Sequence, residues 1–144
     1  MSKKNRIVLL IISLVVLAGA VCFTVNGFSA KNWVAAFSRR RNITILSDFG
    51  GVGGSSFKSR LTKQERTKLI DILEKADMKK HNNHLKSDPR YWFIAGKFKI
   101  GYSYEVEMIV CASDESIEYY LSEDADKELF ALCESIALRC YNKQ

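Results

Sequence analysis

Residues 91–111 read YWFIAGKFKIGYSYEVEMIVC, and their pattern decides the expected fold. In 102–111, apolar or aromatic side chains at even-numbered positions alternate with polar ones. A period of two indicates a strand that is buried on one face. In 91–100 the even-numbered positions are again mostly apolar, and two lysines occupy odd-numbered positions. We therefore predict two antiparallel strands, followed after a turn by a third strand at 116–121.

The predicted register follows from the apolar face that the strands share. The apolar faces of paired strands must coincide, so the numbers of paired residues sum to an even number. Lys97 then lies opposite or diagonal to Glu105 and Glu107, which become its cross-strand partners. The same parity places three aromatic side chains on the outer face, either as a binding surface or covered by the loop 50–57. These are Tyr91, Phe93 and Tyr120.

Amphipathic helices flank these strands. At the start of 62–79, Thr62 and Glu65 have the spacing of a capping box, and an apolar stripe follows. Ser122 is a favourable N-cap for a second helix that runs to about Cys140, with acidic residues in its first turn. The predicted apolar positions are Leu69, Ile70, Leu73 and Ala76 in the first helix, and Leu129, Phe130, Leu132, Cys133, Ile136, Ala137, Leu138 and Cys140 in the second.

This order of elements predicts an α+β fold. A β-prone segment at 43–46 precedes the first helix, which gives the order β-α-β-β-β-α. An antiparallel sheet with two helices on one face buries the apolar side of each element. We expect the domain to span 61–144 and 26–60 to form a juxtamembrane collar and linker. The glycine-rich stretch 50–54 lacks the spacing of a phosphate-binding loop and is typical of a flexible connection.

The N-terminal apolar run, 7–25, contains no charged residue. Its length approaches the roughly 20 apolar residues that a membrane-spanning helix needs. Basic residues lie on both sides of the run, in 1–6 and at Lys31 and 39–41, and those in 1–6 favour a cytoplasmic N-terminus because they are closer to the run and are inserted first. We therefore predict a signal anchor: a cytoplasmic segment 1–6, a single-pass transmembrane helix at 7–25 that contacts the lipid bilayer, and an extracytoplasmic domain in the cell envelope. An alternative is a signal peptide cleaved near Ala20, which would release a secreted form.

Charge is distributed unevenly along the chain, whose net charge is +6. Residues 58–99 are predominantly basic, and residues 101–136 carry ten acidic side chains against Lys127. Either the two halves pair across one fold, or the domain has a dipolar surface that orients it near anionic lipid or an anionic envelope polymer. The basic residues form no recognisable motif with aromatic ones, so nucleic acid is not an expected partner.

The candidate chemistry is sparse. His81 and His84 lie three residues apart near acidic residues, without the further spacing of a metal site. Glu105 and Glu107 are paired carboxylates without a sign of an apolar pocket. We assign no catalytic, cofactor-binding or metal residues, and predict a non-enzymatic interaction domain. The alternative is an enzyme, or an enzyme accessory, that acts on envelope polymers, which requires these four side chains to converge in one pocket.

The cysteines of the domain are predicted to be free. Cys133 and Cys140 are separated by about 10.5 Å along one helix, beyond the reach of a disulfide. Cys111 has an odd number and is expected to point away from that helix. We predict three free thiols, with Cys133 and Cys140 buried and Cys111 the most accessible. Cys22 is expected to be a small apolar residue of the membrane helix.

Overall fold

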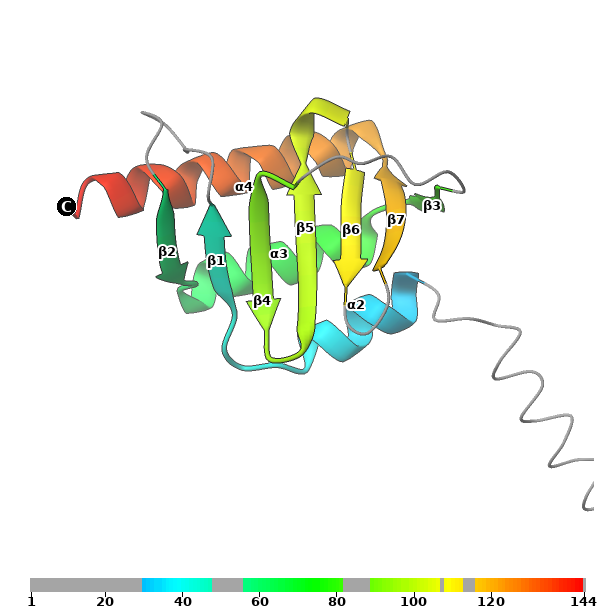
Figure 1. Cartoon of the computed structure of the whole chain (residues 1–144), viewed down its shortest axis with the longest axis horizontal. Helices are drawn as coiled ribbons and strands as arrows, with labels where there is room; N and C mark the ends of the chain where they lie inside the picture. Colours follow the sequence, from blue (N-terminus) through cyan, green and yellow to red (C-terminus); the bar gives the residue numbers. More distant parts are fainter. Residues whose placement is uncertain (1–29, 48–55, 82–88, 107, 113–115, 144) are drawn as a thin grey trace, which may run out of the picture.

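The computed structural model describes residues 30–47, 56–81, 89–106, 108–112 and 116–143. Within them, three α-helices cover one face of a seven-stranded antiparallel sheet (Figure 1). The fold is therefore α+β with an antiparallel sheet, as the sequence pattern predicted. The segments predicted as cytoplasmic N-terminus and membrane anchor lie outside the described residues.

The sheet has the strand order β2-β1-β4-β5-β6-β7-β3, and all neighbours are antiparallel. Its strands are β1 (Thr44–Ser47), β2 (Phe57–Arg60), β3 (Met78–Lys80), β4 (Tyr91–Ala95), β5 (Phe98–Ser103), β6 (Met108–Ala112) and β7 (Ser116–Leu121), and a 3-10 turn, η1 (Tyr104–Val106), separates β5 from β6. The helices are α2 (Ala30–Ser38), α3 (Lys63–Lys75) and α4 (Glu123–Tyr141). Helix α3 contacts both α2 and α4, so it occupies the middle of the helical layer.

The predicted strand 91–100 is in fact a hairpin of β4 and β5. Its two-residue turn is Gly96-Lys97, and Gly96 has a φ of 65°, a left-handed conformation that favours glycine. Tyr91 pairs with Tyr102 and Phe93 with Ile100, so the numbers of paired residues sum to an odd number. The predicted even-sum register is therefore wrong.

This register removes the expected cross-strand charge pairs. Lys97 lies in the turn, Glu105 lies in η1, and Glu107 is outside the described residues. Tyr91 and Phe93 face the helices and are buried, contrary to the predicted outer aromatic patch. Tyr120, the third predicted member, is exposed.

Two side chains lie close to the Cα atom of Gly101 on the sheet face opposite the helices. Gly101 pairs with Trp92 across β4 and β5. A Cβ atom at Gly101 would lie 2.4 Å from Cγ of Pro89 and 2.9 Å from the Trp92 ring. Glycine is therefore required here because the Pro89 and Trp92 rings fill the space that a side chain would need.

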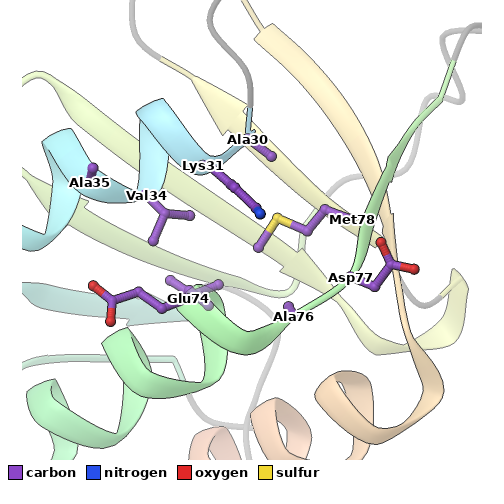
Figure 2. Close-up of a pocket in the computed structure, with 9 residues that line it drawn as sticks. Ala30, Lys31, Val34, Ala35, Glu74, Ala76, Asp77 and Met78 are labelled. Atoms are coloured by element: carbon purple, nitrogen blue, oxygen red, sulfur yellow. The ribbon is translucent and has the colours of Figure 1, made fainter.

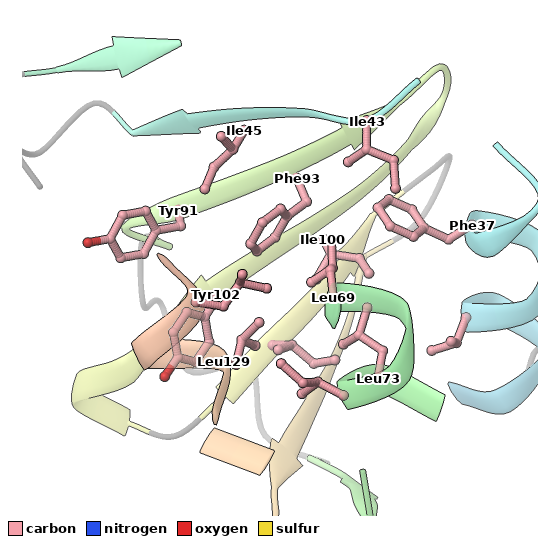
Figure 3. Close-up of a cluster of buried hydrophobic side chains, with 14 of the residues drawn as sticks. Phe37, Ile43, Ile45, Leu69, Leu73, Tyr91, Phe93, Ile100, Tyr102 and Leu129 are labelled. Atoms are coloured by element: carbon pink, nitrogen blue, oxygen red, sulfur yellow. The ribbon is translucent and has the colours of Figure 1, made fainter. Parts of the chain in front are cut away.

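The core lies between the sheet and the three helices, and Figure 3 shows it in section. Phe37 from α2, Leu73 from α3 and Leu129 from α4 pack against Ile100 and the neighbouring strand residues. Residues 30–60, expected as a collar and linker, therefore contribute α2, β1 and β2 to the same folded unit. The buried residues of α2 are Trp33, Val34 and Phe37.

Helix α3 begins as predicted. The Thr62 hydroxyl accepts a hydrogen bond from the backbone N–H of Glu65, and the Glu65 carboxylate accepts one from the N–H of Thr62. The helix ends at Lys75, earlier than the predicted Lys79, because 78–80 extends and pairs with β7 as an edge strand.

The outcome for the apolar positions differs between the helices. In α3, Ile72 is buried, whereas the predicted positions Ile70 and Ala76 are only partly buried. In α4 most of the predicted stripe is buried, but Cys140 is only partly buried, and Phe130 and Leu138 at its margins are exposed. Ser122 occupies the predicted N-cap position of α4, but its side chain makes no capping hydrogen bond.

Candidate functional site

A groove lies between α2, the end of α3 and the start of β3. Its volume is about 490 Å³, which is within the usual range of ligand sites. Figure 2 shows Val34 and Met78 pointing into the space between α2 and the end of α3. The lining residues are Ala30, Lys31, Val34, Ala35, Leu73, Glu74, Ala76, Asp77 and Met78.

The groove has an apolar floor and a charged rim. Val34 and Leu73 are buried core residues whose surfaces close its base. The carboxylates of Glu74 and Asp77 lie at opposite ends in Figure 2, and Lys31 extends between them. The ionisable lining residues therefore carry two negative charges and one positive charge, so the rim favours a cationic ligand.

A basic edge lies at the other end of α2, beside the β4–β5 turn. We use this name for Arg39, Arg40, Arg41 and Lys97, which are all exposed. The guanidinium carbon of Arg40 lies 5.3 Å from the centre of the Phe98 ring, and the Lys97 ammonium lies 5.6 Å from it. Cations at this distance are attracted to an aromatic face, so Phe98 holds two members of the edge together.

Hydrogen bonds from a side chain of α3 also fix the C-terminal end of α2. The Arg66 guanidinium donates to the backbone carbonyls of Ser38 and Arg40, at 2.6 and 3.0 Å. Terminal carbonyls of a helix lack partners within the helix, and a cation there also complements the helix dipole. Arg66 therefore positions the backbone that carries the basic edge.

Two buried tyrosines attach α4 to the sheet. The Tyr91 hydroxyl donates to Glu134 Oε1 at 2.7 Å, and the Tyr102 hydroxyl donates to Asp126 Oδ1 at 2.7 Å. Burial, followed by the hydrogen bond to the carboxylate, raises the pKa of each tyrosine well above its usual value. Both phenols therefore stay protonated and serve as structural donors.

The far end of α4 is attached to α3 by a two-point ion pair. Arg139 Nε donates to Glu65 Oε1 at 2.7 Å, and Nη2 donates to Oε2 at 3.0 Å. Burial alone would raise the pKa of Glu65, but the hydrogen bonds from Arg139 and Thr62 outweigh it and lower this pKa below its usual value. Glu65 therefore links the start of α3 to the end of α4 as a carboxylate.

The structure places two of the four candidate catalytic residues, His81 and Glu105, on different elements. His81 directly follows β3, Glu105 is in η1, and Glu107 and His84 lie outside the described residues. His81 does not line the groove. Within the described ranges, no group of three or more His, Cys, Asp or Glu side chains is placed to hold a metal ion.

His81 contacts an acidic and an aromatic side chain, and the sequence pattern predicted neither contact. Its Nδ1 atom lies 3.5 Å from Glu118 Oε2, and both side chains are largely buried. The geometry of this contact is not that of a hydrogen bond, so His81 Nδ1 has no hydrogen-bond partner among the groups described. The Tyr120 ring packs edge-on at 4.8 Å between centroids. The sequence pattern extends the first helix to residue 79, so it does not predict that His81 pairs with Glu118 beside β3 and β7.

The described cysteines form no disulfide, as predicted, but their exposure differs from the prediction. Cys111 is 1 % exposed, because the η1 turn reverses the parity of β6 and places odd-numbered residues against the helices. Burial raises the pKa of the Cys111 thiol to about 12 and that of Cys133 well above its usual value. Cys140, expected to be buried, is the most accessible of the three.

Known protein families, curated proteins and solved structures contain no match to this chain. In the part of the chain that the structure describes, no helix has both the length and the apolar character required to cross a membrane.

Proposed function

We propose that the protein is a single-pass, membrane-anchored binding protein whose non-enzymatic domain lies outside the cytoplasm. The apolar run 7–25 serves as the anchor, and the basic residues of 1–6 keep the N-terminus in the cytoplasm. The observation that carries a binding role is the groove between α2, α3 and β3. It begins at Ala30, so only residues 26–29 separate the proposed anchor from the proposed binding site.

The groove suits an apolar side chain accompanied by a positive charge. Val34, Leu73 and Met78 provide the apolar contact, and methionine adapts its shape to different ligands. Glu74 and Asp77 flank this surface and are both exposed. The proposed ligand is therefore a segment of another envelope protein in which an apolar residue adjoins a lysine or arginine.

Site-specific photo-crosslinking in intact membranes tests this function. A photoreactive phenylalanine analogue replaces Ala35, which is exposed and lines the groove. The matched control carries it at Ala131, which is exposed on α4. We expect one discrete adduct from position 35 and none from position 131, since a partner seated in the groove contacts only the first.

Charge substitutions identify the ligand class. The double variant Glu74→Gln/Asp77→Asn should weaken the adduct at position 35, and Lys31→Gln should leave it unchanged or strengthen it. The opposite order would show that the ligand is anionic. Equal adducts from positions 35 and 131, or none from position 35, would contradict binding in the groove.

The contact between His81 and Glu118 favours a second candidate, an enzyme or enzyme accessory that acts on envelope polymers. A carboxylate beside an imidazole is an arrangement that can orient a general base. We expect His81→Gln to abolish any polymer cleavage by the full chain and to leave crosslinking at position 35 unchanged. Polymer turnover that survives this substitution would exclude His81 as the base.

A further inference from the structure

The positive charge of the basic edge is not neutralised by the segments that form it. The stretches 30–47 and 91–103 contain no acidic residue and contribute α2, β1, β4 and β5. None of the ion pairs between described residues involves a member of the basic edge. Four exposed cations therefore concentrate on one side of the domain, where they favour an anionic partner.

The acidic first turn of α4 lies on a different side from the basic edge. Helix α4 begins with Glu123 and Asp124, and it lies across the opposite part of the helical layer from α2, with α3 between them (Figure 1). The domain has a basic side that contains α2 and the β4–β5 turn.

The basic edge lies one helix length from the point where the chain enters the domain. Ala30 is the first residue of α2, and the basic edge follows the last turn of the same nine-residue helix. Figure 1 shows α2 and the β4–β5 turn along the same border of the sheet. At about 1.5 Å per residue, α2 spans roughly 14 Å. A surface from which the chain emerges at residue 30 therefore comes within reach of the basic edge when α2 lies along that surface.

We propose that the basic edge binds the anionic headgroups of the bilayer that holds residues 7–25, and thereby fixes the orientation of the domain. This inference rests on the proposed membrane anchor. Clustered lysines and arginines beside a membrane helix are attracted to anionic lipid within about one Debye length of the surface. Lipid is the chosen partner because the tether keeps the headgroups close to the edge at all times.

The test uses the full chain in nanodiscs made either of zwitterionic lipid alone or with one-third anionic lipid. Hydrogen exchange is measured for peptides that cover residues 39–42 and 95–98. We expect exchange of these peptides to be slower in the anionic nanodiscs. Each basic side chain that reaches the headgroups should slow it by a further factor of about five. The triple variant Arg39→Gln/Arg41→Gln/Lys97→Gln should lose this difference.

A charge-matched control is Lys63→Gln/Lys68→Gln/Lys143→Gln, which removes three exposed cations from α3 and the C-terminus. It should keep the lipid-dependent protection. Loss of protection in this control would show that net charge, and not the basic edge, is responsible, and would overturn the inference. Identical exchange of the unmodified chain in both nanodiscs would also overturn it.

Two further outcomes separate the causes of failure. Polyphosphate added to zwitterionic nanodiscs, at the same phosphate concentration, should give no protection; equal protection would identify a soluble polyanion as the partner instead of lipid. Alkaline washing of the nanodiscs tests the anchor independently. Loss of the chain would refute both the anchor and this inference, whereas retention without lipid-dependent protection would refute this inference alone.

Discussion

The α4 side and the α2 side of the helical layer are attached to the domain in different ways. Helix α4 combines a buried apolar stripe with hydrogen bonds to Tyr91 and Tyr102 and an ion pair to Glu65. Helix α2 is held by Trp33, Phe37 and their apolar neighbours, with Arg66 at its C-terminal carbonyls. The groove and the basic edge both adjoin α2.

This difference indicates that the α4 side mainly stabilises the fold, whereas the α2 side carries the proposed binding surfaces. Directional hydrogen bonds fix the angle of α4 to the sheet, because a donor left without its acceptor in a buried position is costly. The contacts of α2 are mainly non-directional, and its exposed surface offers both an apolar concavity and positive charge. We therefore expect substitutions at α4 to change stability and exposed substitutions at α2 to change binding.

The largest expected effect tests whether α2 is part of the core. Phe37→Ala should destabilise the domain by about 3–5 kcal/mol, because it empties a fully buried aromatic site. Leu129→Ala on α4 should cost a comparable amount, about 2–5 kcal/mol. Denaturant unfolding measures both. The control is Lys31→Ala, because Lys31 is exposed on α2. If Phe37→Ala lowered the free energy of unfolding no more than this control, α2 would be peripheral to the core.

A smaller effect concerns the ion pair of the α4 side. Arg139→Met should cost about 2 kcal/mol at neutral pH, since it leaves the Glu65 carboxylate without a charged donor. The lowered pKa of Glu65 means that the pair stabilises the fold above its usual pKa of 4.5 and that this contribution is lost as the pH falls further. Unfolding midpoints of the two proteins should therefore converge in acid. A constant difference down to strongly acidic pH would contradict this role.

The tyrosine attachments are expected to contribute less individually. Tyr102→Phe should cost about 1 kcal/mol, whereas Tyr120→Phe, at an exposed position, should be close to neutral. The raised pKa of Tyr102 stabilises the fold fully below its usual pKa of 10.0, and this contribution declines as the pH rises above that value. Absorbance titration should show Tyr102 ionising only with unfolding; ionisation near pH 10 in the folded chain would contradict its burial.

The smallest effect is a difference in thiol reactivity that leaves stability unchanged. Cys140 should react first with a maleimide, and Cys111 and Cys133 should react only after denaturation, because both are buried and have raised pKa values. Mass spectrometry of the labelled peptides gives the order. Early labelling of Cys111 would restore the outward orientation expected from the sequence and contradict the β6 register.

The sequence predicted the features of the fold that depend on local contacts. Thr62 and Glu65 identify the start of α3 because both halves of the capping box lie within one helical turn. The α4 stripe was predictable because its buried positions repeat with the helical period. The sheet register was not, since the two-residue turn at Gly96 and the η1 turn each change which parity faces the helices.

The candidate site depended on tertiary contacts that no local pattern reveals. The apolar face of α2, with Trp33 and Phe37, suits a membrane interface as well as a protein core, and the sequence pattern predicted a juxtamembrane collar and linker for this segment instead of a core helix. The groove forms only where α2 meets the end of α3 and Met78. The basic residues of 39–41 were visible in the sequence, but their proximity to Lys97 required the fold.

The central claim, that the chain is anchored by 7–25 with its domain outside the cytoplasm, is tested most directly by labelling single cysteines in intact cells. The chain carries either Lys143→Cys, at an exposed position of the domain, or Ser2→Cys, with Cys22 and Cys140 replaced by alanine. A membrane-impermeant maleimide should label position 143 equally before and after permeabilisation, and position 2 only after it. Labelling of position 143 only after permeabilisation would contradict the account.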